Sequence, residues 1–335
     1  MKPPPILTRP VLTRPVLSWP AHTRSVLTRP TLTLLALAAA TAQAGVTQPA
    51  MRQRIDGEIE ALVTLAKAPP SVDASALATL PGPVKRYLAY TGADRAPAAR
   101  FTHFRFEGEV RLPITGSARG VTRATPWMAT RGEQYMALSA QGLGYVWDSV
   151  WQQGPDTTID VRDLYARGDT HIWAVRSDGR VLVDERHDDI NRTYMVRFFA
   201  EATQSPTMLL PGRHLRWEAV DEQRARAHVK DGPLSASMLC SFEPDGALTR
   251  CESDDRLLRF TGEVPQRWVS ARWVMTRGDY RLFGALRVPT TMSVSWLMPE
   301  GDFEQVRART TAVDFDTAAP YPAKDASTAA RPAAN

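Results

Sequence analysis

In the stretch FRFEGEVRL, residues 104–112, apolar side chains alternate with charged ones. A period of two residues is that of a β-strand with one buried face and one face in water. The same alternation returns in residues 224–230 and 291–296. We therefore predict a mainly β protein (α+β) built on a large curved antiparallel sheet or half-barrel. Further strands are expected near residues 117–124, 131–138, 170–176, 180–184, 214–219, 234–242, 247–258, 267–280 and 303–315.

A few segments instead repeat apolar residues every three to four positions, which is typical of amphipathic helices. They lie near residues 55–66, 83–91 and 190–202. The third segment is rich in aromatic residues, and Asp188 or Asp189 is placed to cap it. A sheet must cover its apolar face with another element, so we expect this helix to cover the inner face.

The N-terminal segment has the order of a secretory signal peptide. Its first 44 residues contain cations but no Asp or Glu, then an apolar run over 32–40, then Ala42-Gln43-Ala44 before Gly45. The apolar run is shorter than the roughly 20 residues that span a bilayer. We therefore predict residues 1–44 to be a removable leader, no membrane span after its cleavage, and a periplasmic or secreted bacterial protein.

The rest of the chain divides by its pattern into three parts. Residues 45–98 are expected to be helical, and residues 99–315 to form one antiparallel β domain with its helix near 190–202. Residues 316–335 are mostly Ala, Pro, Thr and Asp without apolar periodicity, which predicts a disordered tail. A monomer is expected.

The charge balance argues against nucleic acid as a partner. The leader holds five of the 41 Lys and Arg residues, which leaves 36 against the 36 Asp and Glu. Binding to phosphates draws on a surplus of clustered cations. The predicted mature chain has no such surplus.

The two cysteines, Cys240 and Cys251, flank the turn Pro244-Asp245-Gly246. A two-residue loop at Asp245-Gly246 places them opposite each other, whereas a three-residue loop with a bulge shifts the register by one. In an oxidising compartment they are expected to pair as a disulfide.

Short catalytic and cofactor motifs are absent from the sequence, including G-x-S-x-G, G-x-x-x-x-G-K, G-x-G-x-x-G and H-E-x-x-H. We therefore expect no cofactor and favour a binding protein over an enzyme. The cluster Glu185, His187, Asp188 and Asp189 has the residue types of a metal site, but its place before a helix favours capping, so no metal is expected.

Several charged and aromatic residues fall in apolar surroundings, where a charge needs a partner or a function. Asp255-Arg256 is one such pair. The candidates for a ligand site are Glu133, Tyr135, Trp147, Asp148, Arg162, Asp163, Phe198 and Glu201.

A set of short motifs resembles an uncharacterised bacterial family known only as a domain of unknown function. The motifs are LPGPVKRYL (80–88), GYVWD (144–148), VRD (161–163), RFFAEA (197–202), PTMLLP (206–211), RWEAVD (216–221), GDY (278–280) and VP (288–289). The resemblance covers residues 80–315 and implies no reaction, cofactor or ligand. The expected architecture is similar to that of periplasmic lipoprotein-carrier half-barrels, which is an analogy of fold alone.

Three functions follow as hypotheses. The first is an envelope protein that binds an apolar ligand, such as a lipid or a lipidated protein, in the groove of the half-barrel. The second is a carboxylate-dependent, hydrolase-like enzyme of the cell envelope, which requires at least two of the candidate acids to meet in one pocket. The third is a ligand-free scaffold, which a filled sheet interior would favour.

Overall fold

The computed structural model describes residues 45–263 and 265–319. The predicted leader and residues 320–335 of the predicted tail lie outside this range. One sheet of 13 strands dominates, with every neighbouring pair antiparallel. In spatial order its strands are β8 (Val181–Glu185), β7 (Asp169–Arg176), β6 (Thr157–Ala166), β5 (Gly142–Gly154), β4 (Met128–Ser139), β1 (Phe101–Val110), β17 (Phe303–Phe315), β16 (Leu286–Leu297), β15 (Arg272–Phe283), β12 (Leu248–Ser253), β11 (Leu234–Phe242), β10 (Arg224–Asp231) and β9 (Leu215–Ala219).

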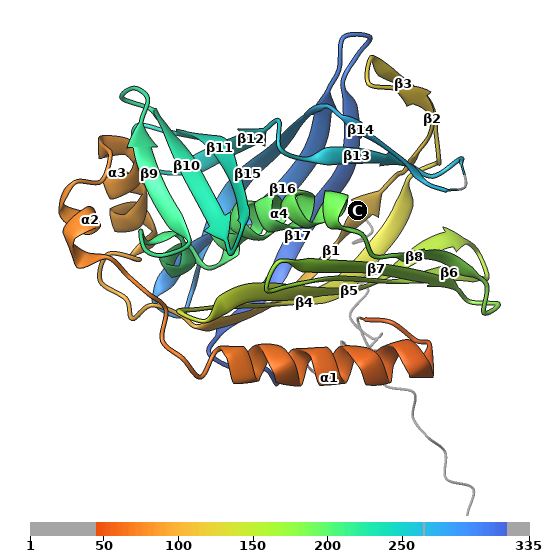
Figure 1. The fold of residues 1–335 in the computed structure, drawn as a ribbon, viewed down its shortest axis with the longest axis horizontal. Helices are drawn as coiled ribbons and strands as arrows, with labels where there is room; N and C mark the ends of the chain where they lie inside the picture. Colours follow the sequence, from red (N-terminus) through yellow and green to blue (C-terminus); the bar gives the residue numbers. More distant parts are fainter. Residues whose placement is uncertain (1–44, 264, 320–335) are drawn as a thin grey trace, which may run out of the picture. The chain divides into compact units, whose positions relative to one another are not determined.

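The sheet curves so that its two ends face each other across a helix (Figure 1). We call β4–β8 the first arm and β9–β12 the second arm. Helix α4 (Asn191–Glu201) lies between them and contacts β6 and β7 of the first arm and β10 and β11 of the second. The predicted mainly β fold, with an open curved sheet and a helix on its inner face, is confirmed.

A second helix covers the opposite face of the first arm. Helix α1 (Pro49–Leu65) packs on β4 and β5 (Figure 1). Strand β5 is therefore buried on both faces over most of its length, and β6 over its central residues. A strand that is buried on both sides does not alternate in polarity. For this reason residues 142–154 and 157–166 are not among the strands that alternation predicts.

Two predicted strands are interrupted. The expected strand 247–258 is β12 followed by β13 (Leu257–Phe260), and the expected strand 267–280 is β14 (Arg267–Ser270) followed by β15. Strands β13 and β14 pair as a separate hairpin, as do β2 (Pro113–Ser117) and β3 (Gly120–Ala124). The chain thus leaves the large sheet twice, once for each hairpin. The remaining α-helices of the described residues are α2 (Ala74–Ala78) and α3 (Gly82–Thr91).

The predicted cap of α4 is wrong. Residues Asp188–Ile190 form a 3-10 turn that leads directly into the helix. The N-cap position is held by Ile190, so no side chain there accepts a hydrogen bond from the N–H groups of the first helical turn. Asp188 instead accepts a long hydrogen bond from the side chain of Asn191, at 3.4 Å.

The cysteines lie opposite each other, as the two-residue loop predicted, but the loop itself has three residues, 244–246, because the backbone N–H of Glu243 donates to the carbonyl of Ala247 and Phe242 lies opposite Leu248. Cys240 on β11 is opposite Cys251 on β12, and a bulge between Ser241 and Phe242 separates this pair from the turn. Both are buried and both are free thiols, so the predicted disulfide is not formed in the structure. Across residues 45–263 and 265–319, the helices are too short or too polar for any of them to span a bilayer.

Candidate functional site

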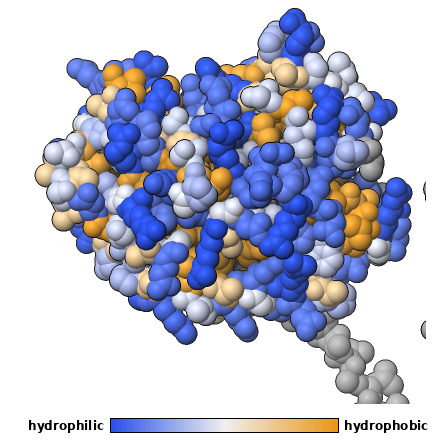
Figure 2. All heavy atoms as spheres, in the orientation of Figure 1, coloured by the Kyte–Doolittle hydropathy of each residue, from blue (hydrophilic) through white to orange (hydrophobic). Residues whose placement is uncertain are grey.

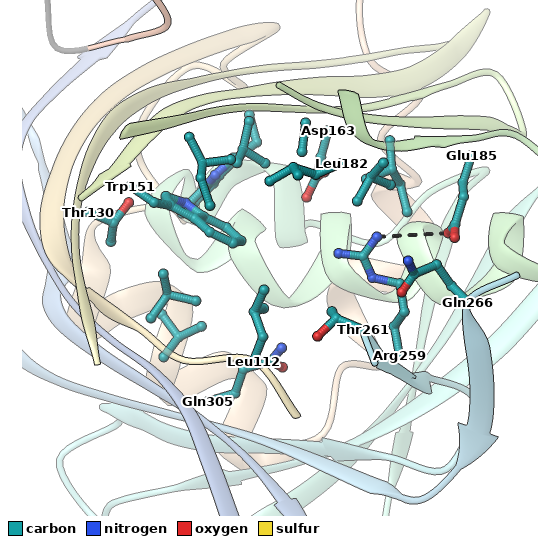
Figure 3. A pocket seen from close by; sticks show the side chains of 18 of the residues that line it. Leu112, Thr130, Trp151, Asp163, Leu182, Glu185, Arg259, Thr261, Gln266 and Gln305 are labelled. Carbon is teal, nitrogen blue, oxygen red and sulfur yellow. Dashed lines mark ion pairs between the residues drawn. The ribbon is translucent and has the colours of Figure 1, made fainter. Parts of the chain in front are cut away.

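The inside of the curved sheet is not filled by side chains. A cavity of about 740 Å³ lies beside α4, enclosed by the first arm, the hairpin β13–β14 and strands β15–β17 (Figure 3). Pockets of about 300 to 1,000 Å³ are the usual size for small-molecule sites. The cavity is therefore our candidate site.

The walls of the cavity are largely apolar and aromatic. Val, Ile, Leu and Met side chains from eight strands line it. Five tryptophans line it as well: Trp147, Trp151, Trp268, Trp273 and Trp296. Trp147 stacks on Phe106 with 3.9 Å between ring centroids and donates its indole N–H to Ser149. On the face shown in Figure 2, hydrophilic side chains predominate and apolar ones form separate clusters.

One charged cluster borders the cavity on the side of α4. Arg197 donates to Asp163 of β6 at 2.6 Å and to Glu201, one helical turn later, at 2.8 Å. Glu201 also accepts from the side chain of Gln134 at 2.7 Å. Burial opposes the charge of Arg197, but Glu201, Tyr145 and Asp163 hold its pKa well above the usual value. The guanidinium also lies 4.6 Å from the ring centroid of Trp147, so an ion pair and an aromatic wall meet here.

A second arginine, Arg256, lies over the rings of Trp273 and Trp296, at 4.7 and 5.8 Å from their centroids. Among the described residues no carboxylate forms an ion pair with Arg256, and its buried Nε has no hydrogen-bond partner. Burial first, and then the charge of Arg197, lower the pKa of Arg256 to about 10. This cation on the cavity wall has aromatic neighbours but no anion.

A third pair lies at the other end of the cavity, beside the edge strand β8. Arg259 of β13 faces Glu185 with 3.9 Å between Nη1 and Oε2, too long for a hydrogen bond (Figure 3). Both atoms are buried without a direct hydrogen-bond partner in the described structure. Burial raises the pKa of Glu185.

The eight candidate residues fall into two groups on opposite faces of the first arm, one facing α4 and the cavity and the other facing α1. Trp147, Asp163 and Glu201 line the cavity, whereas Phe198 of α4 points into the hydrophobic core and not into the cavity. The other four lie beneath α1, on the opposite face of the sheet: Glu133, Tyr135, Asp148 and Arg162. Neighbours in a strand point to opposite faces, so Trp147 and Asp148, like Arg162 and Asp163, cannot share one pocket.

The outer four residues belong to a hydrogen-bond network that attaches α1. Asp148 accepts from the backbone N–H of Val46 at 2.6 Å and pairs with Arg52 of α1. Arg162 donates to the backbone carbonyl of His171 at 2.7 Å and faces Glu58 of α1 at 3.4 Å. Burial raises the pKa of Asp148 and lowers that of Arg162. These contacts indicate a structural role.

Glu133 and Tyr135 belong to the same outer network. Glu133 accepts hydrogen bonds from Tyr135 at 2.7 Å and from Arg105 at 2.8 Å, and lies 2.8 Å from a ring nitrogen of His103. Burial opposes the ionisation of Glu133, but the hydrogen bonds from His103, Arg105 and Tyr135 outweigh it and lower its pKa. Burial and the Glu133 charge raise the pKa of Tyr135.

Sequence reasoning missed Arg197 and Arg259 as site residues, and noted Arg256 only as a charge in apolar surroundings. A signal for Arg197 exists in the sequence, because Arg197 and Glu201 have the i, i+4 spacing of an ion pair on the apolar helix. Within residues 45–263 and 265–319, no three His, Cys, Asp or Glu side chains are grouped to hold a metal ion.

Together, the fold and the cavity define an open antiparallel half-barrel that carries an internal apolar pocket with a charged border. The chain belongs to a family of unknown function, DUF6544, which it matches over residues 70–308. That range includes all 17 strands apart from the end of β17, and it includes α4. No curated protein matches the chain.

Proposed function

We propose that this protein binds an apolar ligand, of the size of a single acyl chain or the lipid of a lipidated partner, inside the half-barrel. The observation that carries this proposal is the cavity of about 740 Å³ walled by five tryptophans. Burying apolar ligand surface against such walls gains about 25 cal/mol per Å². A ligand-free scaffold would favour a filled interior, and the cavity argues against it.

Binding of N-phenyl-1-naphthylamine, a neutral apolar dye, tests this proposal. The dye should gain fluorescence with the protein and be displaced by long-chain lipids. Ala174 lines the cavity, so Ala174→Phe should fill part of it and weaken dye binding at least tenfold. Val220→Phe, at an exposed position outside the cavity, is the matched control and should bind as the parent does.

Thermal melts establish that both variants are folded, and Ala174→Leu provides a smaller substitution if Ala174→Phe is not. A folded parent protein that binds neither the dye nor any lipid extracted from its native membrane would overturn the proposal.

The alternative of a carboxylate-dependent enzyme draws on one observation. Asp163 and Glu201 both border the cavity, as that hypothesis requires. Both are engaged by Arg197, which favours a structural charge cluster over an acid and base pair. If Asp163→Asn abolished turnover of an ester in the cavity while leaving dye binding intact, the enzyme would be the better assignment.

We also propose that the protein is exported and cut after Ala44. The backbone of Gly45 passes directly against the buried carboxylate of Asp148, since a side chain at Gly45 would collide with it. A cut at this point would place a new cationic amino terminus beside that carboxylate. N-terminal sequencing of protein from the cell envelope should begin at Gly45, and an uncut chain in the cytoplasm would refute the assignment.

A further inference from the structure

Five ionisable side chains interact around the second half of α4. Arg197, Arg256 and Arg277 provide three positive charges, and Asp163 and Glu201 provide two negative ones. Arg197 bonds both acids directly, and Glu201 also influences the buried Arg277, which lies 3.5 Å from the carbonyl of Ala200. Among the three arginines, only Arg197 therefore forms a direct ion pair with an acid of this cluster in the described residues.

Arg256 lines the cavity and has no direct counter-charge among the described residues. Arg277 has none either, but it does not line the cavity. Asp163 and Glu201 bond Arg197 rather than Arg256, and Glu185 faces Arg259. A buried charge is costly unless it is paired and hydrogen-bonded. Contact with two indole rings offsets this cost only in part, since a cation–π contact contributes about 0.5–2 kcal/mol.

The wall next to Arg256 also contains an unpaired donor that lies beneath the cavity surface. The indole N–H of Trp273 is buried and has no hydrogen-bond partner in the described structure. Trp273 and Arg256 both line the cavity, and the guanidinium lies over the indole ring. The available group is the Arg256 guanidinium, because a cation without an anion at the border of an apolar cavity matches the head group of an amphiphilic anion.

We propose that the ligand of the cavity is a single-chain carboxylic acid, whose carboxylate pairs with Arg256 and whose hydrocarbon chain lies against the tryptophans. This inference rests on the proposed function. A monoanion supplies the direct counter-charge that Arg256 lacks among the described residues. The planar guanidinium matches the two oxygens of a carboxylate, so two parallel hydrogen bonds can form.

The test compares three probes of equal chain length on the full chain: hexadecanoate, hexadecan-1-ol and hexadecyl phosphate. Each displaces N-phenyl-1-naphthylamine, so the affinity of each is measured on the same cavity. The parent protein should bind hexadecanoate at least tenfold more tightly than the alcohol. Equal affinity for acid and alcohol would overturn the inference and leave apolar binding intact, and tighter binding of the phosphate would overturn the carboxylate assignment.

Variants then assign the effect to Arg256. Arg256→Gln should lose at least tenfold in affinity for hexadecanoate and bind the alcohol and the dye as the parent does, whereas Arg256→Lys should retain part of the preference. Arg192→Gln is the matched control, because the Arg192 side chain is 56% exposed and pairs only distantly with Asp255.

A preference for the acid that survives in Arg256→Gln would refute the role of Arg256. If the Gln variant does not fold, two measurements test the role of Arg256 instead. They are the affinities of Arg256→Lys and the comparison of acid and alcohol on the parent protein. Failure of the dye itself to bind would be the failure of the proposed function.

Discussion

Trp147 and Asp148 are neighbours in the chain but belong to different parts of the protein. The indole lines the cavity, whereas the carboxylate faces α1 and binds the chain that leads into it. The same division separates Asp163 from Arg162. Each of these residues therefore acts either at the cavity or in the attachment of α1. Substitutions at adjacent positions should thus affect either ligand binding or the stability of α1 on the sheet.

Glu133 allows this to be tested through pH. Its pKa is below the usual value of 4.5, so the ionised carboxylate contributes stability above pH 4.5 that is lost as the pH falls through the folded-state pKa. Glu133→Gln should thus lower the free energy of unfolding near neutral pH, and the difference from the parent should shrink at about pH 3. Urea denaturation at both pH values measures it. A deficit that is the same at both would contradict the assigned cause, and the exposed Glu60→Gln should show no comparable deficit.

At the scale of elements, α1 packs on the sheet through apolar residues along its length, and its hydrogen bonds to the sheet are concentrated at its N-terminal side. The backbone N–H groups of Thr47 and Gln48 donate to Asp160 of β6 at 2.8 and 2.6 Å. Arg52 bridges two acids, the buried Asp148 of β5 and Asp56 of its own helix, whose side chain is 61% exposed. The buried acids on β5 and β6, rather than the helix itself, therefore fix where α1 begins.

Asp160→Ala should loosen α1 without unfolding the sheet. The amides of Thr47 and Gln48 lose their acceptor, at a cost of about 1–3 kcal/mol. Hydrogen exchange should accelerate in residues 46–65 and stay slow in strands such as β16. Asp56→Ala removes only an exposed ion pair and should change stability by less than about 1 kcal/mol. Global loss of protection in Asp160→Ala would show that α1 is not a separable element.

At the scale of the whole molecule, the open sheet is held in its curve by α4. The strands at its two edges, β8 and β9, do not pair with each other, and α4 packs on both arms. The arms also contact each other directly, since Tyr165 of β6 donates to Asp231 of β10 at 2.9 Å. Phe198 and Phe199 of α4 are fully buried and contact each other edge to face.

Phe198→Ala should destabilise both arms together. Truncation of a buried Phe costs about 3–5 kcal/mol, and hydrogen exchange should increase in β6–β7 and in β10–β11. Phe101→Ala is the matched control, since Phe101 is equally buried but belongs to the cluster under α1. It should affect α1, β1 and β4 and spare the second arm. Loss of protection confined to α4 in Phe198→Ala would mean that the helix does not hold the arms.

The sequence by itself determined the local features of this protein. The two-residue period of residues 104–112 and the apolar stripe around Phe198 indicate a strand and a helix because burial of one face is a local property of spacing. The turn at Asp245-Gly246 likewise predicted that the segments carrying Cys240 and Cys251 pair, but the bulge between Ser241 and Phe242 decided that the two cysteines lie opposite each other.

Only the tertiary structure decided which side chains meet. Strands buried on both faces lose their alternation, so β5 and β6 escaped detection, and so did the division of their residues between α1 and the cavity. Arg256 reaches Trp273 and Trp296 because the chain leaves the sheet after β12 and returns as β15 and β16. Such contacts depend on the curvature of the whole sheet, which no local spacing encodes.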